Sequence, residues 1–221
     1  MTVKDVSRIY VISLPNSERR QEVKHEMNKH FIWFNWFDAI ENKEDGANGL
    51  KETFKKLFTK CLQKGQNNVM VFEDDAMFLC ENAYEEIGKV LTDVPENYRI
   101  VKFGANLLAP VHRITDNLNG IKLSYALHAC LYSKEGMEKI LENIDKTDEP
   151  IDVIIAKFIE PFSCYVSSKM LVTQRPTKSS IFVYDENKHR NIGDLYEKET
   201  GIIRWDKLMK QQWENNTKHL K

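Results

Sequence analysis

Three consecutive carboxylates, Glu73, Asp74 and Asp75, directly follow an apolar run at residues 69–72. Two of the four residues in this run are β-branched, which is typical of a strand buried on both faces. Adjacent carboxylates repel one another and partial burial adds to the cost, so the arrangement is favourable where a cation neutralises it. Divalent cations take oxygen ligands, and ligands of open α/β sheets bind at the carboxyl ends of strands. The cluster therefore predicts a divalent-cation site, with a solvated acidic turn as the alternative.

The composition restricts the class of protein that carries this cluster. The chain has 221 residues, of which 42% are hydrophobic and 29% charged, an ordinary globular composition. Its formal net charge of −1 gives no electrostatic reason to expect a nucleic-acid partner. No apolar run approaches the length of a membrane span, and the four cysteines form no Cys-x-x-Cys pair. We therefore expect a cytoplasmic protein with reduced thiols, and no zinc site, disulfide framework or transmembrane segment.

Strand and helix patterns must position the acidic cluster, and they alternate through the first two thirds of the chain. Strands are predicted at residues 9–14, 31–37, 69–72, 100–103, 123–132 and 170–174. Helices are predicted at residues 17–29, 48–65, 84–91, 134–144 and 151–159. This alternation predicts an α/β fold in which helices flank a mainly parallel central sheet.

Local signals refine two of these segments. In the helix before the acidic strand, apolar residues recur with helical spacing over residues 50–62, with Asn48 as the expected N-cap and Gly65 as the C-terminal stop. In the aromatic segment, Trp33 and Trp36 are expected in the core, because aromatic side chains mostly supply buried area.

The C-terminal part is polar and carries isolated apolar residues. This pattern predicts one or two peripheral helices laid against the body. We expect residues 1–186 to form the main domain and residues 187–221 to be a peripheral helical extension of that same domain. The last segment, residues 207–221, is a candidate for contact with a membrane surface.

Two classes of α/β protein place an acidic cluster at the end of a strand. Response-regulator receivers are excluded, because a long segment precedes the cluster and residues 117–124 supply no later strand ending in aspartate. Nucleotide-sugar transferases of GT-A architecture end a central strand in an Asp-x-Asp-like motif that holds a divalent metal against the donor diphosphate. The metal neutralises charge that builds on the departing diphosphate, and carboxylates anchor the metal.

Within this second class the chain resembles glycosyltransferase family 25, which includes bacterial lipooligosaccharide and animal collagen galactosyltransferases. The resemblance rests on segments in a fixed order, of which Glu-Asp-Asp is the most specific. These segments are residues 9–20, 37–40, 71–76, 100–104, 128–133 and 150–152, and finally Gln174 with Ser179, Ser180 and Ile181. One departure is that residues 49–54 stand where the family usually has a Ser-His pair.

The resemblance implies a GT-A-type domain with a Rossmann-like nucleotide-binding half, Mn²⁺ or Mg²⁺ as cofactor and a UDP-sugar as donor. The implied metal ligands are Glu73, Asp75 and His128; for His128, a hydrogen-bonded histidine inside a strand is the alternative. The implied donor-binding residues are Leu14, Arg19, Asp38, Ala39 and Asp74. For Arg19 the alternative is an exposed helix arginine, and for Asp74 a turn or capping acid.

Asp152 is the implied catalytic base, since an inverting transferase needs a group that takes the proton of the attacking hydroxyl. The alternative is an acid that binds the first-turn amides of the helix after Pro150.

The predicted function is transfer of a hexose, galactose or glucose, from a UDP-sugar to a hydroxyl of a glycan acceptor on a glycolipid or glycoprotein. Such a role belongs to lipopolysaccharide or other polysaccharide biosynthesis. Two alternatives stay open: another metal-dependent enzyme of phosphate chemistry, such as a nucleotidyltransferase, and a sugar- or nucleotide-binding protein with weakened catalysis. The replaced Ser-His pair favours the last of these.

Overall fold

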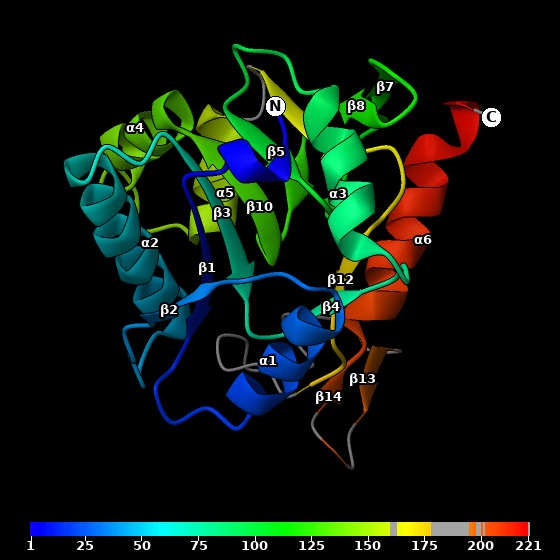
Figure 1. The fold of residues 1–221 in the computed structure, drawn as a ribbon. Coiled ribbons are helices and arrows are strands. Elements are labelled where there is room, and N and C mark those ends of the chain that lie inside the picture. The colour runs from blue at the N-terminus through cyan, green and yellow to red at the C-terminus, as the bar shows by residue number, and fades with distance from the viewer. Residues whose placement is uncertain (160–162, 178–194, 198–199, 201, 221) are drawn as a thin grey trace.

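The computed structural model describes residues 1–159, 163–177, 195–197, 200 and 202–220, and its central feature is an eight-stranded sheet flanked by helices (Figure 1). The predicted α/β class is confirmed. In order across the sheet, the strands are β2 (Asn35–Asp38), β1 (Arg8–Ser13), β3 (Asn68–Glu73), β10 (Ala129–Ser133), β5 (Ile100–Lys102), β11 (Cys164–Ser167), β8 (Leu118–Gly120) and β7 (His112–Arg113).

The sheet is mixed. β1 pairs in parallel with β2 and β3, and β5 pairs in parallel with β11, whereas β10 is antiparallel to both β3 and β5. The connection from β5 to β10 contains short strands and turns but no crossover helix, so β10 returns in the opposite direction. The predicted parallel arrangement therefore holds for β1, β2 and β3, the last of which leads into the acidic cluster, and for β5 with β11. The pairs made by β10, β8 and β7 are antiparallel.

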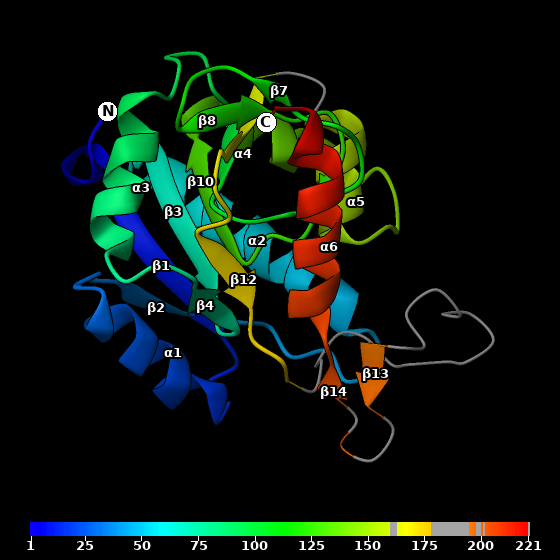
Figure 2. The ribbon, with the colours of Figure 1, turned by 90° about the vertical axis from the view of Figure 1, so that its right-hand side faces the viewer.

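Helices cover both faces of this sheet. α1 (Arg19–Lys29) and α3 (Ala83–Thr92) lie on one face, and α2 (Gly46–Gln63), α4 (Lys134–Asn143) and α5 (Ile151–Phe158) lie on the other (Figures 1 and 2). β3 contributes alternately to the two cores: Met70 and Phe72 pack with the first helix pair, and Val69 and Val71 with the second group. Burial on both faces confirms the interpretation of the apolar run before the acids.

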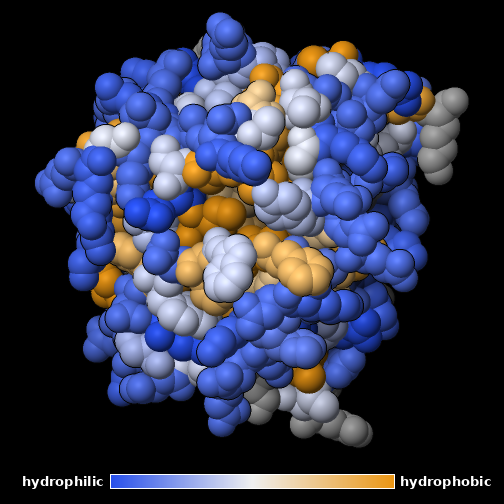
Figure 3. Space-filling model, in the orientation of Figure 1, coloured by the Kyte–Doolittle hydropathy of each residue, from blue (hydrophilic) through white to orange (hydrophobic). Residues whose placement is uncertain are grey.

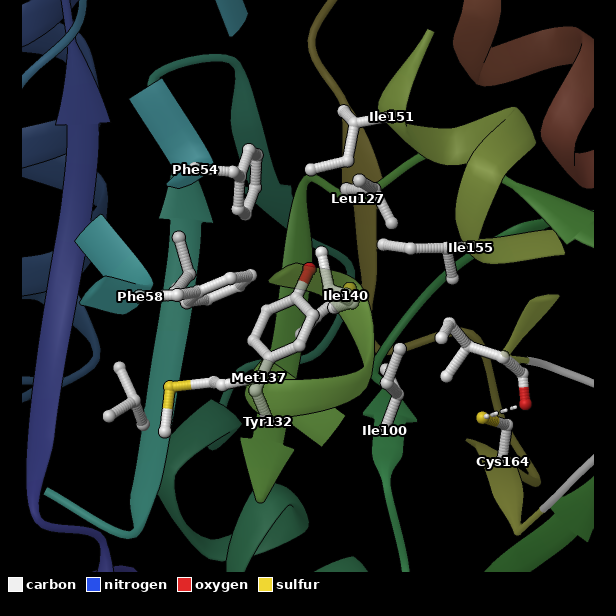
Figure 4. Close-up of a cluster of buried hydrophobic side chains, with 14 of the residues drawn as sticks. Phe54, Phe58, Ile100, Leu127, Tyr132, Met137, Ile140, Ile151, Ile155 and Cys164 are labelled. Carbon is white, nitrogen blue, oxygen red and sulfur yellow. Dashed lines mark hydrogen bonds between the residues drawn. The ribbon is translucent and has the colours of Figure 1, made fainter. Parts of the chain in front are cut away.

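The larger of the two cores surrounds Tyr132 of β10 (Figure 4). Its ring centroid lies 4.8 Å from that of Phe58 and 6.1 Å from that of Phe54, both on α2. Leu127 and Ile151 belong to the same cluster. The core therefore fixes α2, β10 and the start of α5 relative to one another.

The ends of α2 follow ordinary capping chemistry. Asp45, and not Asn48, is the N-cap: its carboxylate accepts a hydrogen bond from the Asn48 backbone N–H at 3.0 Å. The predicted stop at Gly65 is confirmed, since Gly65 has a φ of 66° just beyond the C-cap, a conformation that glycine adopts readily.

The aromatic segment before β2 differs from the expectation. Trp33 is 90% exposed and Phe31 is 80% exposed, while Trp36 is half-buried. β2 begins only at Asn35 and is an edge strand; in the segment before it Ile32 is buried in the core, whereas Phe31 and Trp33 stay exposed. Apolar and aromatic surface is visible in the middle of the face shown in Figure 3.

The predicted C-terminal helix is present as α6 (Trp205–Thr217), which buries Met209 and Trp213. It lies alongside β12 (Val172–Gln174), as Figure 2 shows, and it also contacts β6 (Asn106–Leu107). The remaining strands form three two-stranded sheets, β4 (Ala76–Phe78) with β12 (Val172–Gln174), β6 (Asn106–Leu107) with β9 (Ser124–Tyr125), and β13 (Tyr196–Glu197) with β14 (Ile202–Ile203). Two 3₁₀ turns, Val3–Asp5 and Lys218–Leu220, lie near the chain ends. In the described part of the chain, no helix combines the length and apolarity needed to cross a membrane.

Candidate functional site

Two adjoining cavities open at the edge of the sheet where β1, β2 and β3 end. The strand register aligns Ser13 with Asp38 and Ile12 with Glu73, so the three parallel strands stop at one level. The first cavity, of about 220 Å³, lies over this edge beside the β1–α1 turn, and the second, of about 330 Å³, lies toward α5. The residues that line both cavities are Leu50, Glu73, Gln174 and Trp205. The two cavities therefore form one cleft with Glu73 at their boundary.

Asp74 is the most constrained of the three acids. Its Oδ2 accepts hydrogen bonds from the hydroxyls of Ser13 at 2.6 Å and Ser17 at 3.1 Å. Its Oδ1 lies 3.2 Å from Nη2 of Arg19. These contacts tie the end of β3 to the β1–α1 turn, so Asp74 positions Arg19 at the wall of the first cavity.

Asp75 keeps one carboxylate oxygen unused. Its Oδ2 accepts a hydrogen bond from Nε2 of Gln174 at 3.2 Å, while its Oδ1 is buried and has no hydrogen-bond partner among the described residues. Burial raises the pKa of Asp75 to about 6; the Arg19 guanidinium opposes the rise and the Asp74 charge adds to it. A buried acceptor without a partner is unfavourable unless a cation or a donor occupies the space beside it.

Glu73 shares this excess of negative charge. Burial raises its pKa well above the usual range, and the charges of Asp75, Asp74 and Asp152 raise it further. Among the described residues no three His, Cys, Asp or Glu side chains converge into a ready-made metal-binding set. Glu73 and Asp75 nevertheless fit a divalent cation as a pair of oxygen donors, because burial and the neighbouring carboxylates outweigh the charge of Arg19 at both acids and Asp75 Oδ1 lacks a partner among the described residues.

The predicted donor-binding residues separate into two groups. Leu14, Arg19 and Ala39 line the first cavity together with Asp74, as a donor site requires. Asp38 does not line it: its side chain is 65% exposed and pairs with Arg20. The structure therefore brings four of the five predicted residues to the first cavity, and Asp38 lies outside its lining.

Arg20 was missed by sequence reasoning, which had considered only its neighbour Arg19. Its guanidinium donates to the backbone oxygens of Leu14 at 2.9 Å and Ser13 at 3.0 Å. It also lies 4.7 Å from the ring centroid of Trp36 and pairs with Asp38. Arg20 thus stabilises the β1–α1 turn through two backbone oxygens. No local sequence signal distinguishes Arg20 from Arg19.

The far wall of the first cavity depends on close packing between α2 and the segment after β2. A Cβ added to Gly49 would lie 2.7 Å from the backbone oxygen of Ile40, so only glycine allows α2 to approach this closely. Thr53 reinforces the contact, because its hydroxyl accepts a hydrogen bond from the Ile40 N–H at 2.8 Å and donates to Gly49 O at 2.7 Å. Gly49 and Thr53 belong to residues 49–54, the segment where the family usually has a Ser-His pair. In this chain these two residues serve the packing of α2.

His128 is not brought into the cleft, which corrects its interpretation as a metal ligand. It is fully buried and lines neither cavity. Its Nε2 donates to the backbone oxygen of Val172 at 3.1 Å, and burial lowers its pKa to about 4. His128 is therefore a neutral, hydrogen-bonded histidine that links β12 to the start of β10, which agrees with the alternative given for it in the sequence analysis.

Asp152 lies at the first turn of α5 and lines the second cavity. Its Oδ1 accepts a hydrogen bond from the Val153 N–H at 2.9 Å, so it also binds a first-turn amide. It is close enough to Glu73 to raise the pKa of that carboxyl. The structure therefore places these three acids in one cleft: Asp75 lines the first cavity, Asp152 the second, and Glu73 both.

Several cleft residues have no counterpart in the sequence-based expectations. Gln174 belonged to the family pattern without an assigned role, and here it contacts Asp75 and separates the two cavities. Trp205 and Met209 of α6, and Asn106 and Tyr125 from the β5–β10 connection, line the second cavity. Only chain folding brings these distant segments together. Ser179, Ser180 and Ile181 of the family pattern lie outside the described residues.

Comparison with known protein families gives one match. Residues 6–56 match the model of glycosyltransferase family 25, described as an LPS biosynthesis protein family. The match confirms the inferred resemblance to this family of enzymes over β1, α1, β2 and the first part of α2, which is less than half of the chain. The acidic strand lies outside it. No curated protein sequence is significantly similar to the chain.

Solved structures resemble the chain at very low sequence identity and with TM-scores below 0.5. A glycosyltransferase involved in glycosylation of the major capsid of PBCV-1 is 10% identical, covering 72% of this chain and 79% of its own, with a TM-score of 0.47. An apo UDP-glucose pyrophosphorylase is 8% identical over 74% of each chain, with a TM-score of 0.45. A Drosophila galactosyltransferase 7 variant in complex with manganese, UDP-Gal and xylobiose is 10% identical, covering 60% of this chain and 52% of its own, with a TM-score of 0.32.

Proposed function

We propose that this chain, a relative of glycosyltransferase family 25 over residues 6–56, transfers a hexose from a UDP-sugar to a hydroxyl of a glycan acceptor. Galactose and glucose are the proposed donor sugars. The observation that carries the proposal is the unbalanced pair Glu73 and Asp75 at the boundary of two cavities. A divalent metal ion held by this pair would supply positive charge to the two acids and to the donor diphosphate on one side, which leaves the other side free for an acceptor.

The first cavity is the proposed donor side. Leu14 and Ala39 would contact the nucleoside, and Arg19, held by Asp74, would face the diphosphate. Glu73 and Asp75 would hold Mn²⁺ or Mg²⁺. When bound, such an ion neutralises charge on the departing diphosphate.

The second cavity is the proposed acceptor side, with Asp152 as the base. In an inverting reaction the acceptor oxygen attacks the anomeric carbon from the face opposite the diphosphate, so the base must lie across the cleft from the donor phosphates. The position of Asp152 supports this role, since it lines the second cavity and not the first. Its carboxylate would take the hydroxyl proton as the new bond forms.

The main domain and its C-terminal part would act as one unit. α6 supplies Trp205 to both cavities, which supports treating residues 187–221 as an extension of the domain formed by residues 1–186. The acceptor would be carried by a glycolipid or a glycoprotein, in lipopolysaccharide or other polysaccharide biosynthesis.

Thermal-shift measurements with UDP, GDP and CMP, each with and without Mn²⁺, test the proposal. The expected result is stabilisation by UDP that depends on Mn²⁺, followed by turnover of a UDP-hexose. Stabilisation by metal without any nucleotide effect would instead indicate another metal-dependent enzyme. Binding of UDP without turnover of any UDP-hexose would indicate a binding protein.

A further inference from the structure

The second cavity is lined by both apolar and hydrogen-bonding side chains, a combination that binding of the donor in the first cavity does not require. Most of its lining is apolar, and the rings of Tyr125 and Trp205 lie among these side chains. The hydrogen-bonding side chains in its lining include the carboxylates of Glu73 and Asp152, the amides of Asn106 and Gln174, and the Tyr125 hydroxyl. A ligand that fits must therefore combine apolar surface with several hydrogen-bonding groups, among them donors for the carboxylates.

Asn106 is the most informative of these groups. Its Oδ1 is buried and has no hydrogen-bond partner among the described residues. A buried amide oxygen without a donor is costly, and in a cavity wall it is satisfied when a ligand supplies the donor. Asn106 therefore marks a position where a donor group of the ligand is expected.

The backbone around Asn106 holds this oxygen in place. β6 pairs with β9 so that Asn106 lies opposite Tyr125, and both side chains line the cavity. The following residue, Leu107, accepts a hydrogen bond from Nδ2 of Asn216 on α6 at 2.8 Å. Ala126, next to Tyr125, has a φ of 69°, a conformation that is uncommon for a residue other than glycine. Strain of this kind persists where the surrounding structure imposes it, which is common at ligand sites.

We propose that the second cavity binds a pyranose residue of the acceptor, and that Asn106 Oδ1 accepts a hydrogen bond from one of its ring hydroxyls. A pyranose has hydroxyl donors around its edge and C–H groups on its faces, which match the acceptor groups and the apolar walls respectively. An alkyl chain would bury the Asn106 oxygen without a partner. Asn106 would thereby select the acceptor sugar. This inference rests on the proposed glycosyltransferase function.

Saturation-transfer NMR with methyl hexopyranosides, in the presence of UDP and Mn²⁺, tests the inference on the intact protein. The panel contains methyl galactoside and methyl glucoside, their single-deoxy derivatives, hexanol and a lysine-containing peptide. We expect one pyranoside to bind and one deoxy derivative to bind about fivefold to tenfold more weakly, as the loss of one hydrogen bond predicts. In Asn106→Ala, the parent sugar should weaken by the same factor and that deoxy derivative should weaken no further.

Asn35→Ala is the matched control, because Asn35 is an exposed asparagine at the start of edge strand β2. It should leave pyranoside binding unchanged. The single-deoxy series with the native protein remains decisive even if Asn106→Ala does not fold. Binding of hexanol or of the peptide in place of any pyranoside would overturn the inference, as would equal binding of all deoxy derivatives. If Mn²⁺ and UDP still stabilise the protein in that case, the proposed donor function stands and only the acceptor assignment fails.

Discussion

At the scale of single residues, three adjacent acids have three different environments. Asp74 is satisfied by two hydroxyls and an arginine, whereas Asp75 keeps an oxygen without a partner and Glu73 lies between two cavities. The neighbours of each acid, and not its residue type, determine what it can do. Asp74 positions Arg19, whereas Glu73 and Asp75 are suited to hold a metal ion. The roles of Glu73 and Asp75 as metal ligands remain predictions.

Asp75 gives a prediction with a defined pH dependence. Its folded-state pKa of about 6 exceeds the ordinary value of 3.8, so the folded protein binds this proton more tightly than the unfolded chain does. Without metal, the free energy of unfolding should therefore fall as the pH rises from about 4 to about 6, and then level off. Asp75→Asn should remove this component and raise stability at neutral pH by on the order of 1 kcal/mol.

The same substitution should abolish Mn²⁺-dependent UDP binding, and binding to the native protein should weaken as the pH falls below about 6, because protons compete with metal. Calorimetric titration from about pH 5 to about pH 8 would measure both effects, with Asp145→Asn at an exposed position as the control. Normal metal-dependent UDP binding by Asp75→Asn would remove Asp75 from the site.

Asp152 carries a second prediction at this scale. Asp152→Asn should retain UDP and Mn²⁺ binding but reduce the rate of transfer by about 10²-fold to 10⁴-fold, since only the acceptor of the proton is lost. Release of UDP in an acceptor-dependent assay would measure the rate, and a thermal shift with UDP would measure donor binding. Transfer at the native rate would exclude Asp152 as the base.

At the scale of elements, the cleft depends on how closely α2 approaches the segment after β2. Gly49→Ala would place a Cβ 2.7 Å from Ile40 O and push the cavity wall outward. We expect a loss of about 1–3 kcal/mol in the free energy of unfolding, together with weaker UDP binding. Urea denaturation and calorimetric titration measure the two effects.

Gly88→Ala in α3 is the matched comparison. A Cβ at Gly88 would meet no atom within 4 Å, so the substitution should stabilise the protein by roughly 0.5–1 kcal/mol through helix propensity alone. It should not alter UDP binding. If both substitutions stabilised the protein equally, close packing at Gly49 would have no role in shaping the first cavity.

At the scale of the whole molecule, the cleft is assembled from segments far apart in the sequence. The parallel strands β1, β2 and β3 supply one edge, α5 supplies Asp152, and α6 closes the side with Trp205. Because Trp205 lines both cavities, Trp205→Ala should weaken donor and acceptor binding together, each by about tenfold, through lost apolar contact.

Trp33→Ala provides the control at this scale, since Trp33 is 90% exposed and lies before the start of β2, whereas the cleft lies where β1, β2 and β3 end. It should leave both affinities unchanged. Titrations of UDP and of an acceptor sugar against the two variants would test the comparison. An effect of Trp205→Ala on one ligand alone would show that the two cavities act separately.

The sequence by itself determined the main helices, several strands and the position of the acidic cluster, because hydrophobic periodicity and capping residues act over a few neighbours along the chain. It predicted β1, β3, α4 and the start of α5 after Pro150, and it placed Glu73–Asp75 at a strand end, but it did not predict β8 or β11. The tertiary structure alone decided which residues meet. Contacts between distant segments, which no local pattern encodes, decided the remaining features. These are the antiparallel insertion of β10, the burial of His128, the exposure of Trp33 and the positions of Asn106 and Trp205 at the cleft.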